Sequence, residues 1–125
     1  CNVARASRMG DAPGGQFEIP RNIIRAVANK YVEMAPGTTR EATFCCGGGG
    51  GLLTDELIEL RVKGALPRME ALKQVVDQHG VNFMATICAI CKAQFTKVLP
   101  YYKFNRGMVG GVHQLVSTAI QLGDK

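Results

Sequence analysis

The spacing of apolar residues predicts a first helix from about residue 20 to residue 30. Pro20 suits the first position of a helix, and the apolar residues after it recur three and four positions apart. These residues are Ile23, Ile24 and Val27. The stretch before Pro20 is rich in glycine, proline and polar residues, so we expect it to form a loop.

A longer helical region is predicted to begin after Thr54. Thr54 can cap it, and the carboxylates in its first turn suit the positive end of a helix dipole. Gly64 and Pro67 interrupt the pattern, which leaves two helices or one kinked helix, and Gly80 supplies a C-terminal stop. The apolar stripe consists of Leu57, Ile58, Leu60, Val62, Met69, Leu72, Val75 and Val76.

Apolar residues alternate with other residues from 81 to 87, and this pattern predicts a strand that ends at Cys88. Residues 42–44 look extended and lead into Cys45. Cysteines therefore follow a predicted extended segment twice, and in open α/β sheets the carboxyl ends of neighbouring strands converge. We expect an α/β fold, a small parallel-type sheet with flanking helices and with the cysteines at the C-terminal ends of its strands.

The rest of the chain reads as two further helices and an irregular connection. A short helix is predicted from about 89 to 98, before Pro100. Residues 101–111 look mostly irregular, and residues 112–122 are predicted to form a last helix that ends at Gly123.

Length and composition indicate a single globular domain over residues 1–125. The chain is 46% hydrophobic and 20% charged, and charged or polar residues interrupt each apolar segment before it is long enough to span a membrane. Because the sequence begins with Cys1, we expect it to be a fragment of a longer chain. The net charge of +5 is concentrated in the first third, but no aromatic residues or recognition helix accompany the arginines there, so nucleic acid is not an expected partner.

Five cysteines cannot all pair with one another, which argues against a disulfide scaffold. Cys88 and Cys91 form a CxxC motif, which serves metal binding, redox chemistry or only packing. A structural zinc remains an alternative, although the adjacent Cys45 and Cys46 point their side chains apart and are poorly placed to chelate one ion. In an iron–sulfur cluster, adjacent cysteines can bind different irons.

The glycines that follow the paired cysteines suit such a cluster. Gly47 and Gly48 can adopt positive φ, can bring the backbone close, and can aim N–H groups at the sulfurs of a cluster. A flexible loop is the simpler interpretation of the run that continues to Gly51. No Gly-Lys-Ser/Thr sequence follows, so a phosphate-binding P-loop is excluded.

The order of the cysteines resembles the CCG domain of the cysteine-rich heterodisulfide reductase subunit and its relatives. In that family a cysteine, a CysCysGly motif and a CxxC motif are separated by long gaps; here the gaps are 43 residues after Cys1 and 41 residues after Cys46. The start Cys-Asn-Val-Ala-Arg, the five glycines and the segment Val98-Leu99-Pro100-Tyr101-Tyr102 are similar to DsrK-like subunits of the membrane-bound Dsr complex.

The resemblance implies that the cysteines hold a noncubane [4Fe-4S] cluster that makes or breaks a disulfide or trisulfide. It implies a DsrC-like protein as substrate in dissimilatory sulfur metabolism, DsrM-like membrane subunits as partners, and a cytoplasmic location peripheral to the inner membrane. It also implies a ferredoxin-like part before this chain. The implied ligands are Cys1, Cys45, Cys46, Cys88 and Cys91. Alternatives from other classes are an electron-relay domain that never contacts substrate and a zinc-bound interaction module.

Several thiolates around one cluster leave a net negative charge, so nearby cations are expected. Arg5 follows Cys1 closely, and we expect it to tune the cluster.

Overall fold

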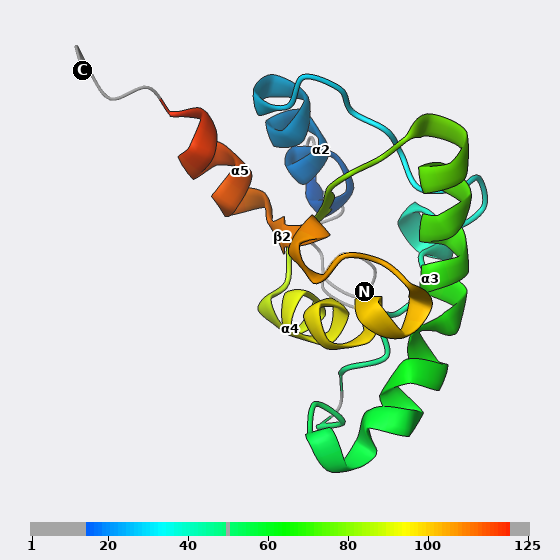
Figure 1. The fold of residues 1–125 in the computed structure, drawn as a ribbon. Coiled ribbons are helices and arrows are strands. Elements are labelled where there is room, and N and C mark those ends of the chain that lie inside the picture. Colours follow the sequence, from blue (N-terminus) through cyan, green and yellow to red (C-terminus); the bar gives the residue numbers. More distant parts are fainter. Residues whose placement is uncertain (1–14, 50, 121–125) are drawn as a thin grey trace.

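The computed structural model describes residues 15–49 and 51–120 (Figure 1). It is rich in helices, with short 3-10 helices labelled η. The elements are, in chain order, α2 (Gly15–Val27), η2 (Arg40–Ala42), η3 (Asp55–Leu57), α3 (Ile58–His79), β1 (Met84–Thr86), α4 (Ala89–Val98), η4 (Leu99–Tyr102), η5 (Arg106–Met108), β2 (Val109–Gly111) and α5 (Val112–Ala119).

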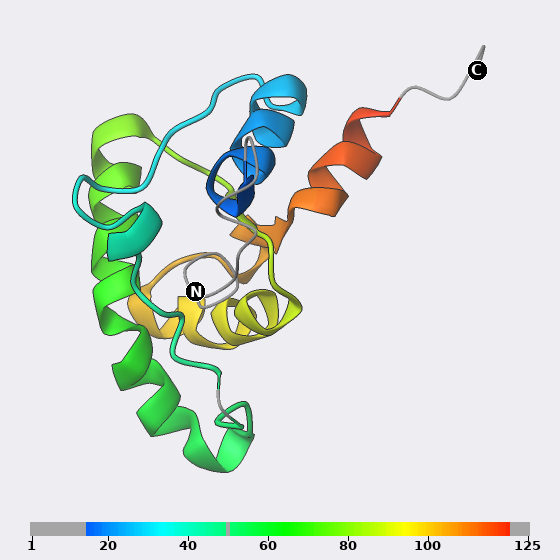
Figure 2. The same cartoon turned by 180° about the vertical axis from the view of Figure 1, so that it is seen from behind.

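The two short strands form a parallel sheet at the centre of the molecule. Met84 pairs with Val109 and Thr86 with Gly111, and the Thr86 hydroxyl donates to the Gly110 carbonyl at 3.2 Å. Helix α4 makes the connection that parallel strands require. The long helix α3 lies along one side of this unit, whereas α2 and α5 pack together on another (Figures 1 and 2). The predicted α/β fold, a small parallel sheet with flanking helices, is confirmed.

The strand predicted from 81 to 87 is shorter than expected. Only Met84–Thr86 pairs, because its partner β2 ends at Gly111, where Val112 begins helix α5. The prediction of irregular structure up to residue 111 was wrong for β2. Two of the residues of that strand are glycines, which have low strand propensity, so its pairing depends on tertiary structure and leaves little local signal.

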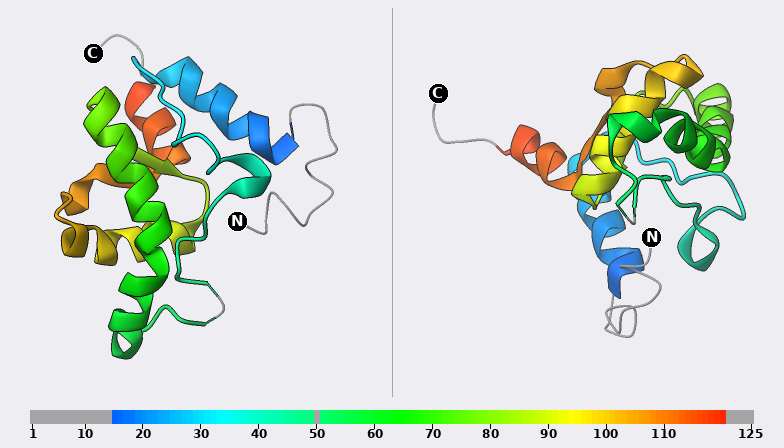
Figure 3. Two further views of the ribbon diagram at one scale, coloured as in Figure 1. Left: turned by 90° about the vertical axis from the view of Figure 1, so that its right-hand side faces the viewer. Right: turned by 90° about the horizontal axis from the view of Figure 1, so that it is seen from below.

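Of the two possibilities for the long helical region, one continuous helix is observed. Helix α3 runs through Pro67, and it bends along its length (Figures 1 and 3). Proline lacks the N–H that would bind the carbonyl of Lys63, which accounts for a bend there. Gly80 ends the helix with a φ of 66°, as predicted. Thr54 precedes the 3-10 turn η3 instead of α3, and its side chain makes no capping hydrogen bond.

The core forms where α3 packs against α4 and η4. Its most deeply buried apolar side chains include Ala65, Met69, Leu72, Phe95, Val98 and Leu99. The predicted stripe was wrong at its start, where Leu57 in η3 and Leu60 in α3 are 38% and 51% exposed. Arg61 and Arg68 occupy the buried face in their place.

The first and last helices differ from prediction at their ends. Helix α2 begins at Gly15, so Pro20 lies inside it; the proline only leaves the carbonyl of Gln16 without its helical donor. Helix α5 ends at Ala119, before the predicted end at 122. Residues 121–125 lie outside the described residues.

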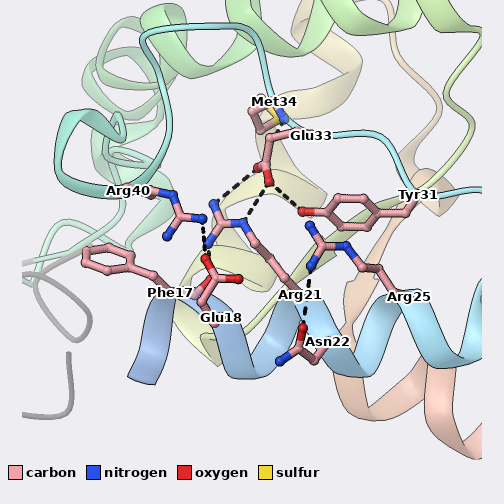
Figure 4. Close-up of polar contacts among 9 residues, drawn as sticks. All are labelled: Phe17, Glu18, Arg21, Asn22, Arg25, Tyr31, Glu33, Met34 and Arg40. Carbon is pink, nitrogen blue, oxygen red and sulfur yellow. Dashed lines mark hydrogen bonds and ion pairs between the residues drawn. The ribbon is translucent and has the colours of Figure 1, made fainter. Parts of the chain in front are cut away.

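A polar cluster ties α2 to the segment that follows it (Figure 4). Glu33 accepts hydrogen bonds from Arg21 at 2.7 Å and from the Tyr31 hydroxyl at 2.6 Å. Arg25 lies over the Tyr31 ring, 4.8 Å from its centroid, and Arg40 pairs with Glu18. These contacts fix the course of the chain toward the paired cysteines.

Candidate metal centre

Four of the five cysteines, from two distant segments, meet at one place. Cys91 and Cys45 lie close enough to Cys46 to shift the pKa of its thiol, and Cys46 and Cys88 do the same for the thiol of Cys91. All four are free thiols. Cys1 and Arg5 lie outside the described residues.

The CxxC half of the site is built by the start of helix α4. Cys88 directly precedes the helix with extended backbone, and its carbonyl accepts the N–H of Lys92 at 3.1 Å. Cys91 lies in the first turn, so its thiol is presented beside that of Cys88. The placement of Cys88 after β1, at the carboxyl end of a strand, is as predicted.

The other half of the site was predicted to follow a strand, and this was wrong. Arg40–Ala42 is a 3-10 turn, Thr43 is extended but unpaired, and neither strand of the described residues includes this segment. The physical reason is that a side chain binds this backbone: the Phe44 carbonyl accepts hydrogen bonds from Arg68 at 3.0 and 3.3 Å.

The glycines after the paired cysteines direct backbone N–H groups at the sulfurs. Gly47 N lies 3.3 Å from Cys45 Sγ, and Gly48 N lies 3.4 Å from Cys46 Sγ. Gly47 has a φ of +86°, which favours glycine. A Cβ on Gly48 would lie 2.8 Å from the Cβ of Gln94 in α4, and a Cβ on Gly47 would lie 2.8 Å from the backbone of Gly64 in α3. The loop therefore packs closely against both helices at these two glycines.

The interaction between Cys46 and Cys91 shifts the pKa values of these two thiols in opposite directions. The hydrogen bond from Cys91 lowers the pKa of Cys46 to about 6, against the opposing effect of burial, and the Gly48 N–H adds to the lowering. Donating to Cys46 raises the pKa of Cys91, and burial raises it further. The site therefore favours a thiolate at Cys46 stabilised by the protonated Cys91.

Sequence reasoning missed Arg68, which is only 5% exposed. Besides the Phe44 carbonyl it binds the Thr38 carbonyl at 3.2 Å and the Thr43 hydroxyl. Burial lowers the pKa of its guanidinium, whereas the nearby thiol groups of Cys91, Cys45 and Cys46 raise it. A signal was present, because Arg68 stands at helical spacing from buried Ala65, Leu72 and Val75.

A second buried network holds the loop from the other side. Gln94, fully buried, donates to the Cys46 carbonyl at 3.0 Å and to the Arg61 carbonyl at 3.1 Å. Its side-chain oxygen accepts from Arg61 Nε at 2.8 Å, and Arg61 also binds the Thr54 carbonyl at 3.0 Å. Two buried side chains thus hold the backbone around the paired cysteines: Arg68 binds the Phe44 carbonyl and Gln94 binds the Cys46 carbonyl.

The donor set fits an iron–sulfur cluster. Within the residues that the structure describes, no three His, Cys, Asp or Glu side chains are arranged to hold one metal ion. The four thiols instead come from two segments, with Cys45 and Cys91 acting on Cys46 and with Cys88 acting on Cys91. A cluster with several irons takes thiolates spread in this way, and N–H groups aimed at sulfur stabilise its charge.

Two curated proteins are similar to the chain. The chain is 45% identical, over 122 residues, to the "Hdr-like menaquinol oxidoreductase iron-sulfur subunit" of Archaeoglobus profundus. The chain is similar to Hdr-like iron–sulfur subunits. It is also 43% identical, over 120 residues, to the "Hdr-like menaquinol oxidoreductase iron-sulfur subunit 2" of Archaeoglobus fulgidus.

The similarity to these Hdr-like subunits covers 98% and 96% of this chain but 20% of each relative. The chain therefore spans about a fifth of the length of the curated relatives that it matches. No family model matches the chain, and no solved structure matches it.

Proposed function

We propose that this chain is the catalytic iron–sulfur domain of an Hdr-like oxidoreductase subunit that reduces a disulfide. The observation that carries the proposal is the meeting of four cysteine thiols, from the CysCysGly loop and the CxxC motif, beside N–H groups directed at sulfur. The similarity to subunits named as iron–sulfur proteins supports it. In its finer form the proposal is a CCG-type domain of the DsrK-like kind, with a noncubane [4Fe-4S] cluster.

The residues would divide the work in the following way. Cys45, Cys46, Cys88 and Cys91, with Cys1, would hold the cluster, which when bound supplies one-electron steps at sulfur. The N–H groups of Gly47 and Gly48 would stabilise its negative charge. Gln94 would hold the Cys46 carbonyl and so fix the position of the ligand loop.

The overall reaction balances with a two-electron donor. A disulfide takes up two electrons and two protons, its S–S bond breaks, and two thiols leave. The relatives are named as menaquinol oxidoreductases, and a menaquinol gives up two electrons and two protons when it becomes the quinone. Electrons would then flow from the quinol toward the disulfide.

Exposure at the site favours a catalytic role over an electron relay. Cys45 is exposed while Cys46 is buried, so one side of the site is open to a substrate. Apolar side chains beside the cysteines are also exposed: Phe44 is 41%, Ile87 49% and Ile90 46% exposed. A disulfide borne by a DsrC-like protein would meet this apolar rim.

The partners follow from the same proposal. A quinol lies in a lipid bilayer, so a subunit that uses its electrons would associate with membrane subunits of the DsrM-like kind, at the cytoplasmic face. Within residues 15–49 and 51–120, no helix combines the length and the apolar character needed to cross a bilayer. Membrane contact would therefore pass through partner subunits as far as this part of the chain is concerned.

The first test is the metal and sulfide content of the chain after anaerobic reconstitution. We expect roughly four irons and four acid-labile sulfides per chain, and their loss in Cys45→Ser. Ala89→Ser is the matched control, because it adds a hydroxyl between Cys88 and Cys91 without removing a thiol, and it should keep the full content. One zinc without sulfide would contradict the proposal and favour an interaction module.

A second test separates catalysis from electron relay. A thiol added to the oxidised, loaded protein should change the electron paramagnetic resonance spectrum, since the open side at Cys45 admits a sulfur ligand. A spectrum that stays unchanged at saturating thiol, in a protein with full iron content, would assign the domain to electron relay.

A further inference from the structure

We infer that Arg68 is the resident counter-ion of the thiol site: its guanidinium positions the loop that leads to Cys45 and supplies buried positive charge to the thiolates. The inference deepens the proposed function, on which its cluster-bound part rests. Arg68 is not a catalytic residue in this scheme, because it makes no hydrogen bond to sulfur and acts through the loop and through its field.

The first observation is the set of atoms that Arg68 binds. Its donors go to the Thr38 carbonyl, the Thr43 hydroxyl and the Phe44 carbonyl. All three belong to the segment that ends at Cys45, and the Phe44 ring also lies against the guanidinium, 5.9 Å from its carbon to the ring centroid. The planar fork of arginine suits several acceptors at once, so Arg68 determines where the first ligand of the pair stands.

The second observation is that the positive charge of Arg68 is buried. A guanidinium that is 5% exposed has lost most of its hydration, and such a charge is costly unless an anion compensates it. The acceptors that Arg68 binds are neutral. In the part of the chain that the structure describes, the carboxylates form ion pairs with Arg21, Arg40, Arg61, Lys73 and Lys97 and none pairs with Arg68.

The thiol groups are the acidic groups that act most strongly on Arg68. Cys91, Cys45 and Cys46 come first, in that order, and Glu33, which is already paired with Arg21, acts more weakly. Arg61, seven positions earlier on the same helix, differs from Arg68 because it has Asp55 at 3.4 Å. The face of α3 that meets the CysCysGly loop thus carries one arginine with a carboxylate partner and one on which the thiol groups act most strongly.

The charge can be tested without a metal, by comparing two alkylating reagents at the exposed Cys45. The ratio of the rates with anionic iodoacetate and neutral iodoacetamide reports local charge, and the thiolate fraction cancels in the ratio. We expect Arg68→Met to lower this ratio about threefold or more at low salt, because it removes a cation close to the thiol. Arg68→Lys should restore most of the ratio.

The control is Lys63→Met, which removes the same charge from the exposed side of α3 and should leave the ratio unchanged. An unchanged ratio in Arg68→Met, or an equal loss in Arg68→Met and Arg68→Lys, would overturn the counter-ion role. If both Arg68 variants fail to fold, the unmodified chain still tests the inference. Salt screens a buried cation weakly, so at high salt the iodoacetate-to-iodoacetamide ratio at Cys45 should stay above the ratio for free N-acetylcysteine. A ratio equal to that of the free thiol would refute the inference.

The loaded protein gives a second readout that a purely structural role would not move. Arg68→Met should lower the reduction equilibrium constant of the cluster about tenfold, which is 59 mV for one electron, with Arg68→Lys close to the unmodified chain. Equal potentials in all three proteins would also overturn the inference. If the unmodified chain takes up no iron and sulfide, the proposed function fails, while the alkylation ratio still decides the role of Arg68.

Discussion

Gly47 packs its backbone directly against the backbone of Gly64 in helix α3. A Cβ on Gly47 would lie 2.8 Å from the Gly64 carbonyl carbon and 3.0 Å from Ala65 N. Because Gly47 follows Cys46, this contact sets how deeply the ligand loop sits on the helix. The two glycines therefore link the helix to the position of the thiols.

Gly47→Ala should displace the ligand loop and lower the iron content after reconstitution. The φ of +86° is strained for alanine, and the new methyl meets backbone that cannot move aside, so we expect a loss of about 1–3 kcal/mol in the free energy of unfolding. Gly49→Ala is the control, since its Cβ would meet nothing within 4 Å. Equal effects of the two substitutions on unfolding and on iron content would show that the close contact does not matter.

Gly80→Ala should destabilise the chain without disturbing the site. Gly80 ends α3 with a φ of 66°, and a Cβ there would find open space, so the cost arises from the backbone alone. We expect about 1 kcal/mol in chemical unfolding. Gly80→Asn should cost less, because asparagine tolerates the left-handed region; an asparagine variant no more stable than the alanine variant would argue against this origin.

Sequence reasoning predicted the surroundings of one pair of cysteines better than those of the other. It expected Cys45, Cys46, Cys88 and Cys91 to converge because each pair would follow an extended segment, but only Cys88 follows a true strand. Helix α4 was predicted with its observed bounds, because its limits are local: a cysteine in extended backbone before it and a proline soon after.

The elements that sequence reasoning missed depend on tertiary contacts. Strand β2, with two glycines, exists because β1 lies beside it. Arg68 was given no role from the sequence and is buried, whereas Leu60 was predicted to belong to the apolar stripe and is exposed. Arginines are buried on this face of α3 because it meets the CysCysGly loop, whose buried carbonyls need hydrogen-bond donors. A leucine cannot donate a hydrogen bond.

The stability of the chain should fall between about pH 10 and pH 12 through Tyr31. Burial, followed by the hydrogen bond to Glu33, raises the pKa of Tyr31 to about 12 from an ordinary value of 10.0. Because the pKa is raised in the folded chain, the contribution of Tyr31 to the free energy of unfolding is complete below about pH 10. It is lost as the pH rises toward 12. The measurement is the free energy of unfolding of the unmodified chain and of Tyr31→Phe across this range.

The difference in unfolding free energy between these two proteins should be constant from neutral pH to about pH 10, where Glu33 stays ionised, and should change above it. Tyr102→Phe is a useful comparison, because burial raises the pKa of Tyr102 as well, yet its hydroxyl binds the Val62 carbonyl and not a carboxylate. A difference for Tyr31→Phe that does not vary up to pH 12 would contradict the assignment.

Gln94→Leu should uncouple the ligand loop from the core. The substitution keeps the approximate volume but removes the donor to the Cys46 carbonyl and the acceptor for Arg61 Nε, and both groups remain buried. Leaving them unsatisfied should cost about 2–4 kcal/mol in unfolding. Gln74→Leu, at an exposed position of α3, should change stability by less than about 0.5 kcal/mol.

The same variant tests whether the network serves the site or only the core. If Gln94 holds Cys46 in place, Gln94→Leu should lower iron retention even at a temperature where circular dichroism shows the chain fully folded. Gln94→Glu keeps an acceptor for Arg61 but loses the donor to the Cys46 carbonyl, so it should preserve more stability than Gln94→Leu while still losing iron. Full iron retention in both folded variants would mean that the contacts at Gly47 and Arg68 position the thiols without Gln94.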